Sequence, residues 1–122
     1  MSASRFAGRN KYGAKKTSCT VGHSHDSKLE ANRCDDLHVI ERTGAIRNLV
    51  VHPQFYFQIN GTQLKHENGR RVGYKADFQY FEGDDNIVED CKGFITKDWP
   101  LRKALFRALF PYVTLREIKK RG

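Results

Sequence analysis

Two stretches of the chain carry its main signal: Tyr74-Lys75-Ala76-Asp77-Phe78 and Ile87-Val88-Glu89-Asp90-Cys91-Lys92-Gly93. Both are typical of strands, the first with a single carboxylate and the second with an Asp-x-Lys triplet. Successive side chains of a strand point to opposite faces, so we expect Asp90 and Lys92 on the same face. If the two strands pair, Asp77 lies beside Asp90, and Lys92 is one step away.

This arrangement of charges has a specific chemical meaning. Two carboxylates that share a site repel each other unless a cation neutralises them, and a hard divalent cation such as Mg²⁺ binds through carboxylate oxygens. A lysine beside the metal orients a water molecule or offsets the charge of a phosphate. The pattern of Asp77, Asp90 and Lys92 therefore favours metal-assisted cleavage of a phosphodiester. A solvated sheet edge is the simpler alternative. Glu89 is expected to face away from Asp90 and to be structural.

The charge of the chain points to the same class of partner. It has 122 residues, the size of one domain, and a net charge of +8, which favours polyanions, nucleic acid first. Residues 1–25 contain five Lys and Arg and no acid, whereas residues 82–92 contain five acids and only Lys92 as a base. A basic chain with one acidic island is typical of a metal-dependent nuclease. An acidic surface turn is the alternative for Glu82, Asp84 and Asp85.

Several classes of protein are not favoured. No apolar run approaches the roughly 20 residues of a membrane span, and the first residues lack the apolar core of a signal peptide. The three cysteines are an odd number at unrelated spacings, so no disulfide framework is predicted. We expect a cytoplasmic protein without membrane contact.

Residues 1–25 are predicted to form a flexible basic arm ahead of a single domain at residues 26–122, because the arm has few large apolar residues and many Gly, Ser and Lys. Its candidate phosphate contacts are Lys11, Lys15 and Lys16. A solubilising tail is an equal alternative on composition alone.

A helix is predicted to begin near Asp26 or Ser27 and to end at Gly44. Ser27 and Glu30 fit a capping box, in which the Glu30 carboxylate reaches back to the backbone. In the alternative, Asp26 caps the helix. Glu30, which shares the apolar stripe of Cys34, then faces the interior and is available to a metal.

The rest of the chain predicts strands over residues 46–51, 55–59, 72–81 and 87–92, a helix over 98–110 and a last strand over 113–118. Asn60-Gly61 and Asn68-Gly69 mark turns within a polar excursion. The order predicts an α/β fold, a mixed sheet flanked by two helices.

The second helix has an expected apolar stripe of Leu101, Leu105, Ala108 and Leu109. Candidate phosphate contacts at and before this helix are Lys97, Arg102 and Lys103. Phe94 and Trp99 flank the helix start, where stacking on a base is one interpretation and a place in the core is the other.

The order of elements and charges resembles the PD-(D/E)xK nuclease superfamily over about residues 26–118. That resemblance implies a restriction-endonuclease-like αβββαβ core, as in Holliday-junction resolvases. The chain is more closely similar to a small family of phage and prophage proteins within the superfamily. The matching stretches are Asn10-Lys11-Tyr12-Gly13-x-Lys15-Lys16, Asp26-Ser27-Lys28-x-Glu30-Ala31, Ala76-Asp77-Phe78, Val88-Glu89-Asp90-x-Lys92-Gly93, and Thr96-Lys97 with Leu101 and Lys103. Ala76 stands where the superfamily name has proline.

The resemblance implies a role for each residue of the site. Asp77 and Asp90 would be the metal carboxylates, and the backbone carbonyl of Cys91 a further ligand. Lys92 would position the attacking water or stabilise the phosphate. Glu30 would complete the metal shell, directly or through water. The implied cofactor is Mg²⁺, with Mn²⁺ as a substitute.

The implied function is a Mg²⁺-dependent DNA endonuclease that cuts branched or structured DNA during phage recombination or DNA processing, in the bacterial host cytoplasm. Many such nucleases are homodimers that cut two strands, although this chain has no clear dimer signature. One alternative is a non-catalytic nucleic-acid-binding module, against which the intact Asp77, Asp90 and Lys92 count. Another is a nuclease acting on RNA or single strands, and no short motif distinguishes it from the DNA endonuclease.

Overall fold

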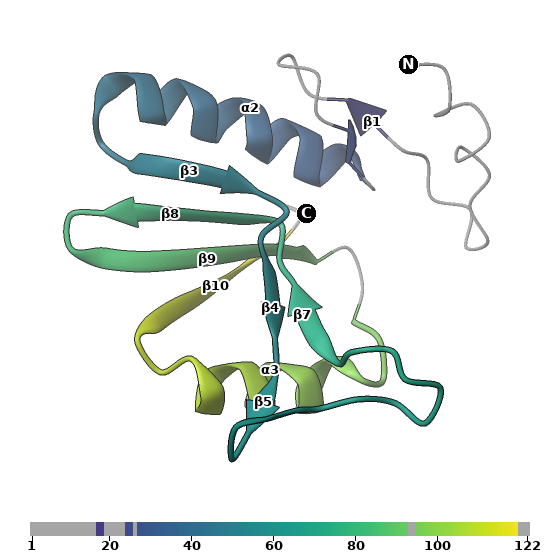
Figure 1. Cartoon of the computed structure of the whole chain (residues 1–122). Coiled ribbons are helices and arrows are strands. Elements are labelled where there is room, and N and C mark those ends of the chain that lie inside the picture. Colours follow the sequence, from purple (N-terminus) through teal and green to yellow (C-terminus); the bar gives the residue numbers. More distant parts are fainter. Residues whose placement is uncertain (1–16, 19–23, 26, 93–94, 120–122) are drawn as a thin grey trace.

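A computed structural model describes residues 17–18, 24–25, 27–92 and 95–119 of the chain (Figure 1). Its elements are α2 (Lys28–Thr43), β3 (Arg47–Val51), β4 (Gln54–Tyr56), β5 (Gln58–Ile59), β6 (Thr62–Gln63), β7 (Gly73–Lys75), β8 (Phe78–Glu82), β9 (Asp85–Lys92), α3 (Trp99–Leu109) and β10 (Val113–Lys119), preceded by the short pair β1 (Thr17–Ser18) and β2 (Ser24–His25).

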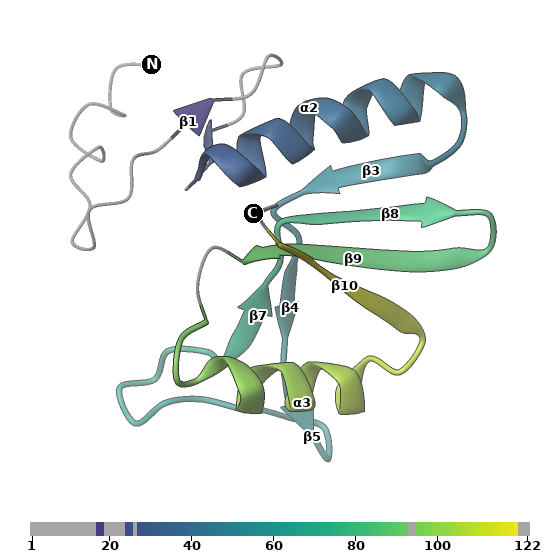
Figure 2. The same cartoon turned by 180° about the vertical axis from the view of Figure 1, so that it is seen from behind.

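The centre of the fold is a four-stranded mixed sheet in the order β10-β9-β8-β3. β10 runs parallel to β9, whereas β8 is antiparallel to both β9 and β3. The two views show α2 lying along one side of the sheet and α3 on the other (Figures 1 and 2). The predicted α/β fold, a mixed sheet flanked by two helices, is therefore confirmed.

The sheet separates two apolar cores, and β9 contributes to both. Ile87 packs towards α2, and the next residue, Val88, packs towards α3, as the alternation of a strand requires. Besides Ile87, the buried residues of the first core are Ala31, Cys34, Leu37, Ile46, Phe78 and Tyr80. Besides Val88, those of the second are Phe57, Tyr74, Ala76, Trp99 and Phe106.

Helix α2 has the caps that its sequence predicts. The Ser27 hydroxyl accepts the backbone N–H of Glu30 at 3.1 Å, and Gly44 ends the helix in the left-handed conformation with φ 86°. The helix buries Glu30 together with Ala31, Cys34 and Leu37. A carboxylate is thus carried into the interior on the first turn.

Outside the four-stranded sheet, β3 and β8 continue into β4 and β7 as one bent ribbon. Val51 pairs with Phe78 before the bend and Gln54 pairs with Lys75 after it, so a single antiparallel register runs through. Beyond the bend the ribbon turns away steeply from β8 and β9 and lies beside α3 (Figure 1).

The prediction of one strand over residues 72–81 is wrong, because the chain divides at Ala76 and Asp77 into β7 and β8. Opposite this break stands Pro53, which fixes its own φ and has no N–H to donate. The Asp77 N–H instead donates to the Glu89 carbonyl of β9, at 3.1 Å. The bend therefore ties the ribbon to the central strand.

Two details of the apolar pattern also differ from expectation. The segment predicted as one strand over 55–59 divides into β4 and β5, and Ile59 is exposed at the Asn60-Gly61 turn. On α3, Leu101 is 68% exposed, and the buried residues are Trp99 and Phe106. The large aromatic rings bury more surface than the leucines, and their contacts with the ribbon set the rotation of the helix.

Candidate metal centre

The bend in the ribbon places His52 opposite Asp77. The His52 N–H donates to the Asp77 carbonyl at 2.9 Å, and the Ala76 N–H donates to the Pro53 carbonyl at 3.0 Å. His52 has φ 59°, an uncommon conformation for a residue other than glycine. His52 was not among the site residues predicted from the sequence. The available signal was a histidine directly before the proline that ends a strand.

Glu30 reaches the same place from the first turn of α2. Its Oε2 lies 2.7 Å from His52 Nε2, and the residue is 4% exposed. A carboxylate only accepts hydrogen bonds, so His52 Nε2 carries the proton of this contact. The side chains of Glu30, His52 and Asp77 offer ligand atoms that all lie within 4.8 Å of one another.

This geometry resolves the two roles considered for Glu30. The cap is made by the Ser27 hydroxyl, which accepts the backbone N–H of Glu30. The Glu30 carboxylate meanwhile faces His52 and Asp77. The helix is thus capped by Ser27, while the Glu30 carboxylate is in contact with His52. Asp26, the alternative cap, lies outside the described residues.

Asp77 lies between Glu30 of α2 and the end of β9. Its Oδ2 accepts the Cys91 N–H at 2.6 Å, which fixes the carboxyl group against β9. Burial raises the pKa of Asp77 to about 9, and the charge of Glu30 and the adjacent Asp90 add to this rise, whereas the Cys91 N–H opposes it. Carboxylates predicted from separate strands thus lie side by side.

Lys92 and Asp90 share a face of β9, as predicted. Lys92 Nζ lies 2.8 Å from Asp90 Oδ2 and 3.7 Å from the centre of the Trp99 ring. Trp99 is 3% exposed and its indole N–H donates to Glu117. It is therefore a core residue that supports the Lys92 ammonium and has no free face for a base. Phe94, the other stacking candidate, lies outside the described residues.

A cavity of about 250 Å³ opens beside these groups and is lined by Tyr74, Asp90 and Lys92 among others. Within the described part of the chain, the Tyr74 hydroxyl and Asp90 Oδ2 are buried without a hydrogen bond, although Lys92 Nζ lies 2.8 Å from Asp90 Oδ2 as an ion pair. Burial and the nearby Asp90 raise the pKa of the Tyr74 hydroxyl, which stays protonated. A buried carboxylate oxygen and a buried hydroxyl at one cavity suit a cation and its water ligands.

Glu89 points to the opposite face, as the alternation of β9 predicts. It is completely buried, and its two oxygens accept from Arg33 Nε at 2.8 Å and Nη2 at 2.7 Å. The Tyr80 hydroxyl donates to the same carboxylate. Glu89 thus fixes β9 against α2, while its neighbour Asp90 faces the cavity.

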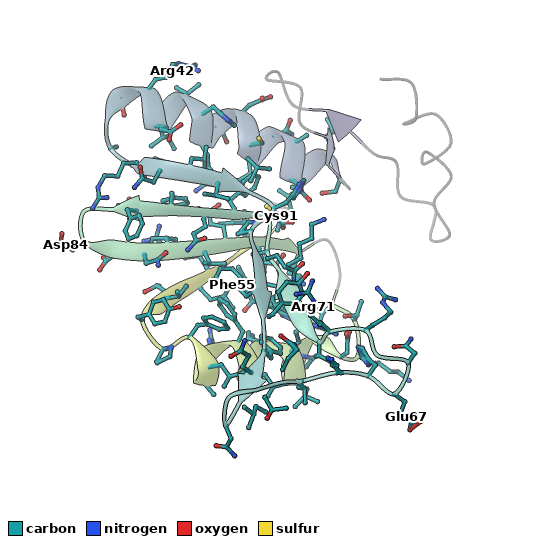
Figure 3. All side chains as sticks on the ribbon, viewed as in Figure 1. Arg42, Phe55, Glu67, Arg71, Asp84 and Cys91 are labelled. Atoms are coloured by element: carbon teal, nitrogen blue, oxygen red, sulfur yellow. The ribbon has the colours of Figure 1, made fainter. Side chains whose placement is uncertain are left out.

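The donor set fits a hard divalent metal. The ligand atoms that come together belong to Glu30, His52 and Asp77, and Asp90 lies beside Asp77 but outside this group. Carboxylate oxygens suit Mg²⁺ or Mn²⁺, and an imidazole is better tolerated by Mn²⁺. His52 is placed to orient Glu30 through their hydrogen bond, a role common around metal ligands. Figure 3 shows Cys91, which donates to Asp77, near the origin of the bent ribbon and far from Asp84 and Arg42.

Comparison with known proteins gives one match. A family model described as "Protein of unknown function (DUF1064)" matches residues 9–121. The chain belongs to the DUF1064 family. No curated protein and no solved structure matches it. The DUF1064 match spans every residue of the candidate site, from Glu30 to Lys92. None of the described helices of this DUF1064 protein is long and apolar enough to cross a membrane.

The predicted phosphate contacts of the DUF1064 chain have different environments. Lys11, Lys15 and Lys16 lie outside the described residues, and Lys97 is exposed. Arg102 donates to the Gly73 carbonyl and to Asp98 Oδ2, the latter at 2.9 Å. Lys103 Nζ lies 2.9 Å from Glu117 Oε2, so its charge is already paired. These contacts stay predictions.

Proposed function

We propose that this DUF1064 protein is a Mg²⁺-dependent endodeoxyribonuclease with a PD-(D/E)xK-type site. One observation carries the proposal: Glu30 of α2 lies with His52 and Asp77 of the ribbon bend, and Asp77 lies beside the Asp90–Lys92 ion pair of β9. Clustering buried carboxylates costs stability unless a cation binds there. A solely structural role would not require this arrangement.

The element order supports a restriction-endonuclease-like core. Without the ribbon and its hairpin, the order α2, β3, β8, β9, α3, β10 is αβββαβ, as the sequence resemblance implies. β10 adds parallel to β9 after the α3 crossover, and the site lies where β8 begins and β9 ends. The hairpin of β5 and β6 is an insertion between β3 and β8.

The proposed roles follow from the contacts. Glu30, Asp77 and Asp90 would hold the metal, and His52 and the Cys91 N–H orient two of these carboxylates. Bound Mg²⁺ supplies charge neutralisation at the phosphate and a more acidic water. The Lys92 ammonium, held by Asp90 and Trp99, is placed at the cavity to donate to a water or a phosphate oxygen.

We retain branched or structured DNA, a bacterial host cytoplasm and two-strand cutting by a homodimer as parts of the proposal. They rest on the resemblance and on the net charge of +8.

The test is cleavage of labelled four-way junction, flap, duplex and single-stranded DNA with Mg²⁺ or Mn²⁺. We expect junction or flap cutting by the wild type and a loss of at least ~10²-fold in Asp90→Asn. Asp84→Asn is the matched control, because Asp84 is an exposed acid at the far end of the sheet (Figure 3).

Each alternative has its own outcome. Binding without cleavage under either metal would favour the non-catalytic module. Cutting of RNA or single strands alone, abolished by Asp90→Asn, would keep the site and change the substrate. Equal cleavage by Asp90→Asn and the wild type would overturn the proposed site.

A further inference from the structure

A second, larger cleft lies next to the candidate metal centre. Its volume is about 500 Å³, and its lining includes Arg70, Arg71, Lys75 and Arg102 but no carboxylate. Lys75 and Arg102 also line the smaller cavity that contains Asp90 and Lys92. The two spaces are therefore adjacent, so a polyanion bound in the larger cleft would extend to the candidate site.

The hairpin between β6 and β7 contributes Arg70 and Arg71 to the cleft. Residues 65 and 71 form a backbone bridge, and the Asn68 side chain accepts the Arg70 N–H at 2.9 Å inside the turn. Figure 3 places Arg71 beside the ribbon and Glu67 at the tip of this hairpin. Among the described residues, Arg70, Arg71 and Lys75 take part in no ion pair, whereas Arg102 pairs with Asp98.

Three cations that form no ion pair within the described part of the chain make this cleft suited to phosphates. Repulsion between like charges is unfavourable in the free protein, and a polyanion that enters the cleft removes it. The cleft is in the size range of roughly 300–1,000 Å³ that holds small ligands. It fits a short piece of one strand rather than the full width of a duplex.

The cleft also contains a flat surface. The Arg71 guanidinium lies 3.9 Å from the centre of the Tyr56 ring and donates to the Tyr56 hydroxyl at 3.2 Å. Tyr56 remains 38% exposed. Bases stack on aromatic rings and on guanidinium planes, but paired bases inside a duplex expose only their edges. This surface therefore suits an unpaired base.

We propose that the cleft binds an unpaired DNA strand next to the cleavage site, with Arg70, Arg71 and Lys75 on phosphates and the Tyr56–Arg71 pair stacked on a base. This inference rests on the proposed nuclease function and deepens it. It assigns the substrate as DNA with a single-stranded segment, such as a flap or an open junction, rather than a continuous duplex.

The test is binding without cleavage, in EDTA. Fluorescence anisotropy compares a labelled single strand of about 12 nucleotides, the matching duplex and an RNA of the same sequence. We expect the wild type to prefer the single strand over the duplex. Arg70→Ala/Arg71→Ala should weaken single-strand binding at least tenfold. It should also make the plot of log affinity against log salt less steep by about 1.4, because two phosphate contacts are lost and each contributes about 0.7.

Two variants separate stacking from charge. Tyr56→Ala keeps every cation and should weaken single-strand binding roughly tenfold, with a smaller effect on the duplex. Arg42→Ala removes one charge from an exposed position at the far end of α2 and should bind as the wild type does (Figure 3). Thermal melting of each variant checks that the fold is kept.

The outcomes distinguish this inference from the nuclease proposal. Tyr56→Ala and the double variant binding single strands like Arg42→Ala would overturn the cleft, even if the wild type cleaves DNA. Their loss of binding, together with a wild type that cleaves nothing under Mg²⁺ or Mn²⁺, would support the cleft and overturn the nuclease. If the RNA binds more tightly than the DNA single strand, the cleft is supported as a single-strand site and its ligand is RNA.

Discussion

At the scale of single residues, the candidate site shifts the pKa of Asp77 strongly. Its folded-state pKa is about 9, raised by burial and by Glu30 and Asp90 from an ordinary value of 3.8. A raised folded-state pKa contributes stability below the unfolded pKa, and that contribution is lost as the pH rises towards the folded value. In the metal-free protein, the contribution of Asp77 to stability should therefore be lost from about pH 4 to about pH 9.

The variant Asp77→Asn tests this directly, because an amide oxygen can still accept the Cys91 N–H but cannot ionise. We expect Asp77→Asn to be more stable than the wild type by about 2–4 kcal/mol at pH 8 in EDTA, and to differ little at pH 4. Urea unfolding at both pH values measures it, with exposed Asp84→Asn as the control. If stability depends on pH in Asp77→Asn as it does in the wild type, the pKa of Asp77 is not raised by its surroundings.

His52 has a role that separates from its backbone conformation. Asparagine tolerates the positive φ of this position, so His52→Asn keeps the bend and removes the imidazole contact with Glu30. Loss of an orienting group beside a metal ligand costs about 10–100-fold in affinity. We expect that loss for Mn²⁺, measured by isothermal titration calorimetry, with a melting temperature close to the wild type. Unchanged affinity would assign His52 to the fold alone.

At the scale of elements, an ion pair between partly buried Arg33 and fully buried Glu89 links α2 to β9. Arg33 makes two charged hydrogen bonds to the fully buried Glu89. Arg33→Met leaves that carboxylate with the Tyr80 hydroxyl but without a counter-charge, and it should destabilise the protein by about 3–5 kcal/mol. The double variant Arg33→Met/Glu89→Leu removes both charges and should recover most of the loss in urea unfolding. If the single and double variants were equally unstable, packing rather than charge pairing would hold the two elements together.

At the scale of the whole molecule, the site joins segments that are far apart in the sequence, so a metal bound there should stabilise the entire fold. A ligand at about 100 times its Kd contributes about 2.7 kcal/mol, which corresponds to a rise of roughly 10 °C in Tm for a domain of this size. We expect this rise on titration with Mn²⁺ or Mg²⁺ in thermal unfolding. It should be absent in Asp90→Asn and intact in Asp84→Asn. A rise of the same size in Asp90→Asn would place the metal elsewhere.

The sequence alone determined most of the local structure. Ser27 and Gly44 define the ends of α2, and the alternation of 87–92 defines β9, because capping and burial depend on residues that are close in the chain. The same alternation placed Asp90 with Lys92 on one face and Glu89 on the other. These assignments needed no knowledge of a distant partner.

Only the tertiary structure decided the rest. The break of residues 72–81 at Asp77 depends on Pro53 in a different strand and on the Glu89 carbonyl of β9. His52 joins the candidate site through the same bend, and the basic cleft forms where the hairpin meets α3. Such juxtapositions depend on how a ribbon bends and how a helix rotates. Contacts between segments far apart in the chain set both, and no local pattern of residues encodes them.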